Sequence, residues 1–318
     1  MTIRLGSSNL NTEDCKDLAR LTKSARKGTP LESNKSIDDI AKGFERLSTD
    51  ENYHLLTALD EEENPVGYIY YYLGFSLMAF IGGFLPLVDE KAGSEAVAIS
   101  LIEASKKDIV ENGFTRLEIE MEFPTNAHRS YSERFVELYR KCGFNFAAEE
   151  MHMRSDLRAI DLPDIEIPQG YLMKKFSEVS YNQIEETAFH VLQDSKEGLF
   201  LSMSQAEREI TLQYWFDKSK PCIDDASLIL QRDGNVVGFV ITRPTDDGLE
   251  IGPVGLLPED RGKGIASYLL ASVLGNLKNS GATSVDLDTT VINFPAQKLY
   301  RKYGFEDVYY KQFYYWSP

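Results

Sequence analysis

The sequence predicts an α+β fold made of two tandem copies of one domain, each a mixed, mostly antiparallel sheet flanked by helices. The first observation behind this prediction is an internal repeat, because residues 138–144 (LYRKCGF) recur as residues 299–305 (LYRKYGF) with one difference. Two further segments recur in the same order: 64–68 as 235–239, and 113–118 as 281–286. The second observation is length, since 318 residues suffice for two domains of about 150 residues that each bury a core.

The boundary between the copies is predicted at a segment rich in prolines and acidic residues. Residues 1–160 would form the first copy, residues 161–169 the linker, and residues 170–318 the second copy. The linker contains Pro163 and Pro168 among several carboxylates. Such a composition is typical of a connecting segment that lacks regular structure.

The elements of the first copy follow from its runs of β-branched and aromatic residues and from one long helical pattern. They are three strands at 55–59, 66–73 and 77–87, a helix at 94–112 and a strand at 117–121. In the second copy, Asp233-Gly234-Asn235 predicts a hairpin with a positive φ at Gly234. Gly281 is expected to end the long helix, as a glycine after the last helical residue commonly does. The expected elements of the second copy are strands at 171–176, 226–231, 236–242, 250–257 and 285–288, and helices at 181–192, 205–216, 262–279 and 294–303.

Composition and charge exclude several classes of partner. The formal net charge is −16, which opposes binding to nucleic acid or to an anionic membrane surface and favours a neutral or cationic small molecule. Three scattered cysteines without a CxxC pair encode neither a disulfide framework nor a zinc knuckle, and they predict a reducing, cytoplasmic environment. Residues 1–7 do not read as a signal peptide, and the apolar run at 75–88 is too interrupted and short to cross a bilayer.

A glycine-rich turn in the second copy carries the clearest chemical signal. Arg261-Gly262-Lys263-Gly264 joins a strand that ends at Leu257 to the long helix. Glycines remove side chains where phosphates would approach, and the first amides of a helix attract anions. No GxxxxGK[ST] segment occurs, which argues against a P-loop. A dinucleotide site would need a third glycine, although Asp288 at the end of the next strand keeps a dinucleotide-binding oxidoreductase open as an alternative.

Two patterns together resemble the GNAT superfamily of acetyl-CoA-dependent acyltransferases. They are Arg261-x-x-Gly264-x-Ala266 and Asn293-x-x-Ala296-x-x-Leu299-Tyr300-x-x-x-Gly304-Phe305. The tandem arrangement is similar to mycothiol synthase-type chains with two GNAT domains. The first copy departs from the pattern, because Ser132 stands where Asn293 would be and the segment at 92–96 has lost the arginine and one glycine and gained Glu95. The resemblance therefore implies a degenerate first domain and an acetyl-CoA-binding second domain.

The resemblance also implies roles for individual residues. The backbone amides of Arg261, Gly262, Lys263, Gly264, Ile265 and Ala266 would hold the pyrophosphate of CoA, without any metal. Leu256 and Leu257 would pair with the pantetheine arm, and their amides would face the developing oxyanion. Asn293 would hydrogen-bond the cofactor arm. Tyr300 would protonate the departing thiolate as a general acid.

The general base is less strongly indicated by the sequence. Glu250, at the start of the strand that leads to Leu257, is the first candidate, and Asp286 and Asp288 on the neighbouring strand are its rivals. A base from solvent would also suffice. The four histidines are scattered without metal-ligand spacing.

The expected activity is transfer of an acetyl group from acetyl-CoA to the primary amine of a small molecule. Direct attack in a ternary complex fits, because the sequence has no GxSxG segment and no cysteine in a nucleophile motif. The first domain would support the fold or shape the acceptor pocket. A non-catalytic acyl-CoA sensor is the main alternative, and the dinucleotide oxidoreductase is the minor one.

Overall fold

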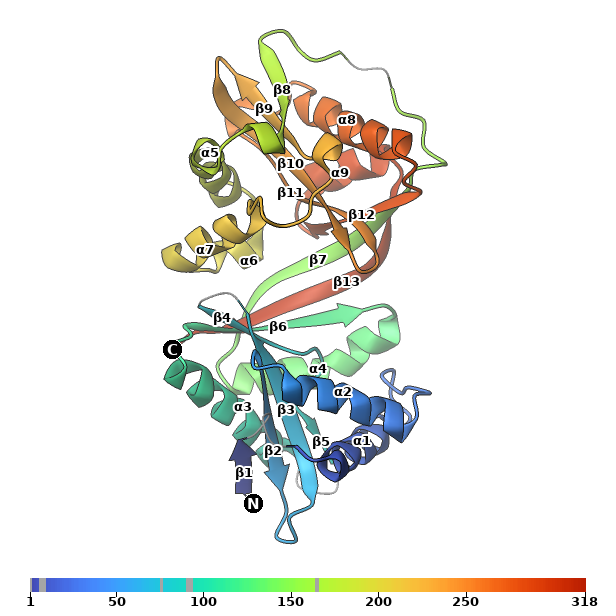
Figure 1. Ribbon diagram of the computed structural model, residues 1–318, viewed down its shortest axis with the longest axis vertical. Helices are drawn as coiled ribbons and strands as arrows, with labels where there is room; N and C mark the ends of the chain where they lie inside the picture. The colour runs from blue at the N-terminus through green and yellow to red at the C-terminus, as the bar shows by residue number, and fades with distance from the viewer. Residues whose placement is uncertain (1, 6–9, 75–76, 90–93, 164–165) are drawn as a thin grey trace. The chain divides into compact units, whose positions relative to one another are not determined.

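The chain consists of two compact units. The computed structural model describes residues 2–5, 10–74, 77–89, 94–163 and 166–318 (Figure 1). The first unit comprises Met1–Ala147 together with Lys311–Pro318, and the second unit comprises Ala148–Tyr310. No helix within the described ranges is both long enough and apolar enough to span a bilayer.

The first unit contains a mixed sheet with the order β1-β2-β3-β4-β6, and β5 pairs with β3. Its strands are β1 (Thr2–Leu5), β2 (Tyr53–Leu59), β3 (Pro65–Leu73), β4 (Met78–Ile81), β5 (Leu87–Val88) and β6 (Arg116–Phe123). Its helices are α1 (Thr12–Arg26), α2 (Ile37–Thr49), α3 (Ser94–Glu111) and α4 (Asn126–Lys141). All described pairings are antiparallel except that of β4 with β6.

The second unit repeats this topology, with the strand order β7-β12-β11-β10-β9-β8. Its strands are β7 (Asn145–Asp156, in this unit from Ala148), β8 (Tyr171–Lys175), β9 (Leu228–Arg232), β10 (Asn235–Thr245), β11 (Gly248–Leu256) and β12 (Ser284–Thr290), and β13 (Phe305–Trp316) starts here. Its helices are α5 (Tyr181–Gln193), α6 (Gly198–Leu201), α7 (Gln205–Trp215), α8 (Ile265–Asn279) and α9 (Phe294–Lys302). The mixed, mostly antiparallel sheet flanked by helices is therefore confirmed in both copies.

Helices cover both faces of the sheet in the second unit. Figure 1 shows α8 and α9 on one face and α5 to α7 on the other. On the α8 side, Val285 and Leu287 of β12 pack with apolar residues of α8 and with Tyr300 in one buried cluster. Because side chains alternate along a strand, Asp286 and Asp288 belong to the opposite face. That face therefore carries the acidic groups of β12.

The parallel strands β11 and β12 pair over only a short stretch. The recorded pairs are Glu250 with Asp286 and Ile251 with Leu287, although β11 continues to Leu256 and β12 to Thr290. The two strands therefore stop pairing before they end. Such an opening exposes backbone groups of β11 on its β12 side.

Two predicted turns are confirmed by their backbone angles. Asp233 and Gly234 have φ values of 53° and 83°, which fits a tight hairpin turn between β9 and β10. Gly281 has a φ of 89° directly after the C-cap of α8. The strand expected at 77–87 is instead split into β4 and β5. Gly82 and Gly83 interrupt it, and Phe84 between the two strands has a φ of 59°.

The division between the units differs from the expected boundary at 161–169. Strand β7 pairs with β12 from Glu150 to Asp156, so residues before position 160 already belong to the second unit. The end of the chain instead belongs to the first unit. There the Lys106 ammonium lies 5.1 Å from the Trp316 ring, and the Arg116 guanidinium lies 4.1 Å from the Tyr315 ring. Cation–π contacts of this kind bind the chain end to the first unit.

Candidate active site

The predicted glycine-rich turn lies between β11 and α8. Gly262 and Gly264 have φ values of 75° and 80°, a left-handed conformation that only glycine adopts without strain. A Cβ atom built at either glycine would have no atom within 4 Å. The turn is therefore bordered by open space, which a side chain at either position would enter.

The start of α8 offers unpaired amides to that space. The N-cap residue is Gly264, and no side chain caps the helix. The first amides of α8, including those of Ile265 and Ala266, therefore lack an intrahelical acceptor, and the helix dipole adds partial positive charge there. Arg261 departs from the expectation, because its amide donates to the Pro258 carbonyl at 3.2 Å. Residues 262–266 remain as candidate amides for an anion.

The side chain of Arg261 supports the strand that precedes the turn. Its Nε donates to the Leu256 carbonyl at 3.0 Å, and its guanidinium pairs with Asp194 at 2.7 Å. Asp260 fixes the start of the turn, because its carboxylate is fully buried and accepts a hydrogen bond from the Tyr171 hydroxyl at 2.6 Å. The half-exposed Lys263 lies 3.3 Å from the same carboxylate. The turn is thus held by polar contacts while the lysine remains at the surface.

The amides of β11 are arranged differently from the expectation for Leu257. The Leu257 amide donates to the Val237 carbonyl of β10 at 2.9 Å, so it does not face the opening beside β12. Hydrogen-bonded and non-hydrogen-bonded pairs alternate along an antiparallel ladder. With Gly238 opposite Leu256 and Val240 opposite Val254, the amides of Leu256 and Val254 point to the β12 side. Val254 is therefore a candidate that the sequence did not indicate, because it depends on the register with β10.

Asn293 begins α9 as its N-cap. Its Oδ1 accepts a hydrogen bond from the Ala296 amide at 3.4 Å. Capping by the side-chain oxygen fixes the orientation of the side chain and leaves its NH₂ group as a donor. The predicted contact with a cofactor arm stays a prediction that this geometry permits.

Tyr300 is a buried phenol without a hydrogen-bond partner in the described part of the chain. Its side chain is 6% exposed, and its ring lies 5.9 Å from that of Phe305. Burial, and secondarily the negative charge of Glu197, raise the pKa of Tyr300 well above its usual value, so the phenol stays protonated at neutral pH. Its counterpart in the first unit, Tyr139, instead donates its hydroxyl proton to the Leu85 carbonyl. Of these two tyrosines, only Tyr300 has a hydroxyl that is available to a bound ligand.

The predicted base candidates lie on neighbouring strands of the second unit. Glu250 is partly buried on β11 and lies opposite Asp286 of β12. Both oxygens of Asp286 accept hydrogen bonds from Arg154, each at 2.6 Å. Asp288 is 2.8 Å from Nδ1 of His152, whose ring stacks on Tyr309 at 4.5 Å. Asp286 and Asp288 are therefore held in polar pairs, and the role of Glu250 as a base stays a prediction.

A fourth carboxylate, Glu197, was missed by the sequence reasoning. It precedes α6 in the short connection from α5 and is partly buried. Burial, followed by the negative charge of Asp288, raises its pKa to about 7. A carboxyl group that titrates near neutral pH can accept and release protons under physiological conditions. No sequence signal marks Glu197, because its surroundings are created by residues distant in the chain.

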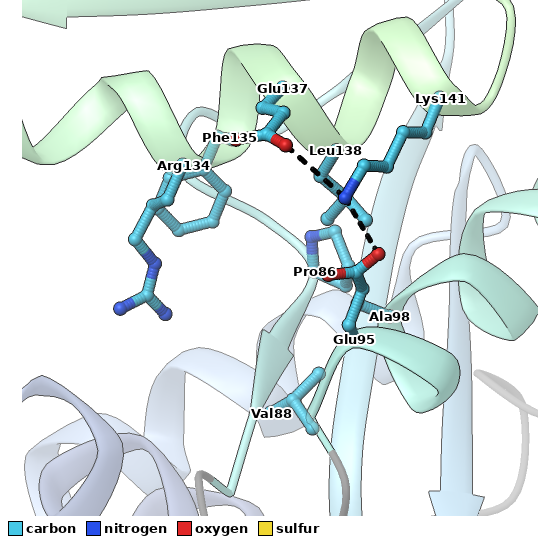
Figure 2. A pocket seen from close by; sticks show the side chains of 9 residues that line it. All are labelled: Pro86, Val88, Glu95, Ala98, Arg134, Phe135, Glu137, Leu138 and Lys141. Atoms are coloured by element: carbon cyan, nitrogen blue, oxygen red, sulfur yellow. Dashed lines mark hydrogen bonds and ion pairs between the residues drawn. The ribbon is translucent and has the colours of Figure 1, made fainter.

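The corresponding region of the first unit contains an ion-paired pocket. Figure 2 shows Lys141 of α4 between Glu95 of α3 and Glu137, at 2.8 and 3.3 Å. The cavity beside them has a volume of about 310 Å³. In the second unit, the matching lysine, Lys302, instead donates to the Ser267 hydroxyl at 2.9 Å. Part of the degenerate turn, residues 92 and 93, lies outside the described residues.

Comparisons with known proteins agree with this geometry. Residues 188–305 match the acetyltransferase (GNAT) family, a segment that includes the glycine-rich turn, Asn293 and Tyr300. The second unit is therefore similar to the acetyltransferases of the GNAT family, and the resemblance inferred from the two sequence patterns is confirmed. Within the described residues, no group of three or more histidine, cysteine or acidic side chains is arranged to hold a metal.

Curated relatives are named as mycothiol acetyltransferases. The chain is 34% identical to the protein of Brachybacterium faecium over 111 residues, which cover 33% of this chain and 32% of the relative. It is 25% identical to the protein of Pseudarthrobacter chlorophenolicus over 311 residues, which cover 92% of this chain and 88% of the relative. The match to the first of these spans about a third of the relative's length.

Solved structures share the fold over the whole chain. A GCN5-related N-acetyltransferase from Sphaerobacter thermophilus has a TM-score of 0.61 at 17% identity, with coverage of 99% of this chain and 95% of that chain. A tandem GNAT protein from the clavulanic acid biosynthesis pathway has a TM-score of 0.51 at 13% identity, with coverage of 99% and 98%. At these identities the likeness concerns the fold, and it supports two GNAT-like domains in tandem.

Proposed function

We propose that the second unit transfers an acetyl group from acetyl-CoA to the primary amine of a small molecule, by direct attack in a ternary complex. The observation that carries the proposal is the uncapped start of α8 beside two glycines with positive φ. Unpaired amides, the helix dipole and open space together suit a diphosphate. The match of residues 188–305 to the GNAT family supports the same assignment.

The residues present fit the cosubstrate. The amides of residues 262–266 would contact its pyrophosphate, and Lys263 and Lys302 would add positive charge at the same helix start. The β12 side of β11, where the amides of Val254 and Leu256 point, would receive the pantetheine arm and the thioester oxygen. Acetyl-CoA supplies an activated acyl group whose carbonyl carbon an amine can attack.

Tyr300 is proposed as the general acid. Its raised pKa keeps the phenol protonated at neutral pH, so a proton is available when the thiolate departs. In the first unit, the equivalent hydroxyl is bonded to the Leu85 carbonyl, and Glu95 in the first turn of α3 places a carboxylate, paired with Lys141, at the start of the matching helix. We therefore assign to the first unit a supporting role without acetyl transfer.

A small amine is the proposed acceptor. The α5 to α7 side of the sheet carries Asp288 and Glu197, and negative charge there would attract an ammonium group. The relatives' name, mycothiol acetyltransferase, points to a small-molecule acceptor as well. The net charge of −16 disfavours nucleic acid as a partner.

Thiol release from acetyl-CoA tests this proposal across a panel of small primary amines. We expect amine-dependent release of one thiol for each acetylated amine, detected by mass spectrometry of the product. Calorimetric binding of acetyl-CoA without turnover on any amine would instead favour a sensor. Absence of binding, or a response to NADH in a fluorescence titration, would contradict the assignment.

A further inference from the structure

A second cavity of the first unit is formed by α1, α2 and the chain that connects them. Figure 1 shows the two helices next to each other, and residues of both line the cavity, which has a volume of about 230 Å³. A water molecule takes about 30 Å³ in the liquid, so the space matches about seven or eight waters or one small organic molecule. The residues that line it lie outside the repeated segments. The likeness between the two copies therefore does not account for this cavity.

Arg26 lines the cavity with a side chain that has no partner. It is the last residue of α1, and its Nε is buried without a hydrogen-bond acceptor. Among the described residues, none forms a hydrogen bond or an ion pair with its guanidinium. A buried donor without an acceptor destabilises a fold, and native proteins retain few such groups. The Nε of Arg26 is therefore a donor that a bound molecule would satisfy.

Two lysines add positive charge to the same wall. Lys23 and Arg26 are three positions apart on α1, which places them on one side of the helix. The Lys23 ammonium donates to the Lys35 carbonyl at 3.0 Å, and this bond joins the connecting chain to α1. Three basic side chains around one small space repel one another, and a bound anion would relieve that repulsion.

The two acidic side chains of the wall are bonded to donors of their own segments. Glu32 accepts a hydrogen bond from the Gly28 amide at 2.7 Å, and Asp39 accepts one from the Ser36 hydroxyl at 2.6 Å. Neither carboxylate forms an ion pair with the three basic side chains of the described wall. The wall thus combines three positive with two negative side chains, and Arg26 stays unpaired although both acids line the same space.

The rest of the wall suits the carbon atoms of a small organic anion. Ile40 is partly buried, and Gly43 contributes no side chain. The Thr22 hydroxyl already donates to the Leu18 carbonyl at 2.7 Å. Arg26 is therefore the group on this wall that is best placed to fix a polar atom of a ligand.

We propose that this cavity binds a small oxyanion and that the Arg26 guanidinium holds its carboxylate or phosphate group. A planar guanidinium presents donors in a fork that matches two oxygen atoms of such a group. The site lies in the unit to which we assign no acetyl transfer. The inference therefore goes beyond the proposed function and does not depend on it.

Titration of the full chain without acetyl-CoA tests the site. The probes are succinate, for a carboxylate, and inorganic phosphate, in a buffer whose anion is chloride. The ¹⁵N–¹H signal of the Arg26 Nε, assigned through its loss in Arg26→Gln, should shift to saturation with at least one probe. Binding should weaken as the salt concentration rises, because the contact is electrostatic. The probe that binds more tightly identifies the kind of oxyanion.

Substitutions separate a binding role of Arg26 from a structural one. In calorimetry, Arg26→Gln should weaken binding of the preferred probe by roughly 10- to 100-fold, because a charged donor is lost. Arg26→Lys keeps the charge without the fork and should lose less affinity. The matched control is Arg46→Gln, an exposed arginine in the last turn of α2, which should leave the affinity unchanged. Without anion, the melting temperature of Arg26→Gln should equal that of the wild-type chain, because no bond in the fold is broken.

Three results would overturn the inference. They are an Arg26 signal that responds to neither probe, an equal affinity for the preferred probe in Arg26→Gln and the wild-type chain, and a lower melting temperature of anion-free Arg26→Gln. The last result would mean that the guanidinium has a partner within the fold. Failure of acetyl transfer on every amine would refute the proposed function alone, because these measurements need no acetyl-CoA.

Discussion

Two equivalent tyrosines should respond differently to the same substitution: one change should lower stability and the other should lower turnover. Tyr300 and Tyr139 occupy matching places in the repeated segment, and both are buried. The Tyr139 hydroxyl donates to the Leu85 carbonyl, whereas the Tyr300 hydroxyl has no partner among the described residues. Replacing each with phenylalanine removes one oxygen atom and little volume. The two variants therefore separate a structural hydroxyl from a catalytic one.

The expected magnitudes follow from these contacts. Tyr139→Phe leaves the buried Leu85 carbonyl without its donor, which should destabilise the first unit by about 1–3 kcal/mol. At about 2–4 °C for each kcal/mol, the melting temperature of that unit should fall by roughly 2–12 °C. Tyr300→Phe breaks no hydrogen bond in the chain, so stability should change little. Loss of a general acid should lower kcat by roughly 10²- to 10⁴-fold, equal to about 3–5 kcal/mol of barrier.

The two tryptophans allow each unit to be followed separately. Trp316 belongs to the first unit and Trp215 to the second. In a Trp215→Phe background, fluorescence during urea unfolding reports the first unit, and thiol release reports turnover. The reasoning would be refuted if Tyr139→Phe lowered kcat as strongly as Tyr300→Phe, or if Tyr300→Phe kept full turnover.

Three further predictions concern the cofactor turn, the chain end and the pH dependence of stability. Gly264→Leu should abolish CoA binding in calorimetry, because the new side chain enters the open space at the start of α8. The control Gly281→Leu, at a residue with a similar positive φ, should leave the affinity for CoA unchanged. Equal losses of affinity in the two variants would contradict this prediction. Trp316→Ala should speed hydrogen exchange in α3 and not in β12, because it removes the cation–π contact with Lys106 of α3, worth about 1–2 kcal/mol. Unchanged exchange in α3 would be evidence against it. Because the native pKa of Glu197 is raised from 4.5 to about 7, its proton stabilises the fold fully below pH 4.5. The unfolding free energy should fall by on the order of 2 kcal/mol as pH rises to 7, and this fall should be missing from Glu197→Gln; parallel curves for the two proteins would disprove it.

Much of the fold follows from local sequence signals. The repeated segment, the Asp233-Gly234 turn and the apolar spacing of α8 predict elements whose type depends on neighbouring residues in the chain. The chain end could not be assigned in this way. The strand β13 is one continuous run of aromatic and polar residues, and only its contacts with Lys106 and Arg116 show that its last residues belong to the first unit.

The candidate site was predictable where chemistry depends on a local motif. The glycines of the turn, Asn293 and Tyr300 lie in recognisable spacings. The amide of Leu257 could not be assigned, because its acceptor is set by the register between β10 and β11. Glu197 is one of 50 acidic residues and has no motif of its own. Its raised pKa arises from burial and from Asp288, which lies in a distant part of the sequence.

A crystal structure of the full chain with bound coenzyme A would test the central claim most directly. The account predicts one nucleotide per chain, with its diphosphate against the amides of residues 262–266 and its sulfur next to the Tyr300 hydroxyl. It also predicts that the Glu95–Lys141 pair stays closed in the first unit. A diphosphate bound beside Glu95, or a sulfur remote from Tyr300, would contradict it.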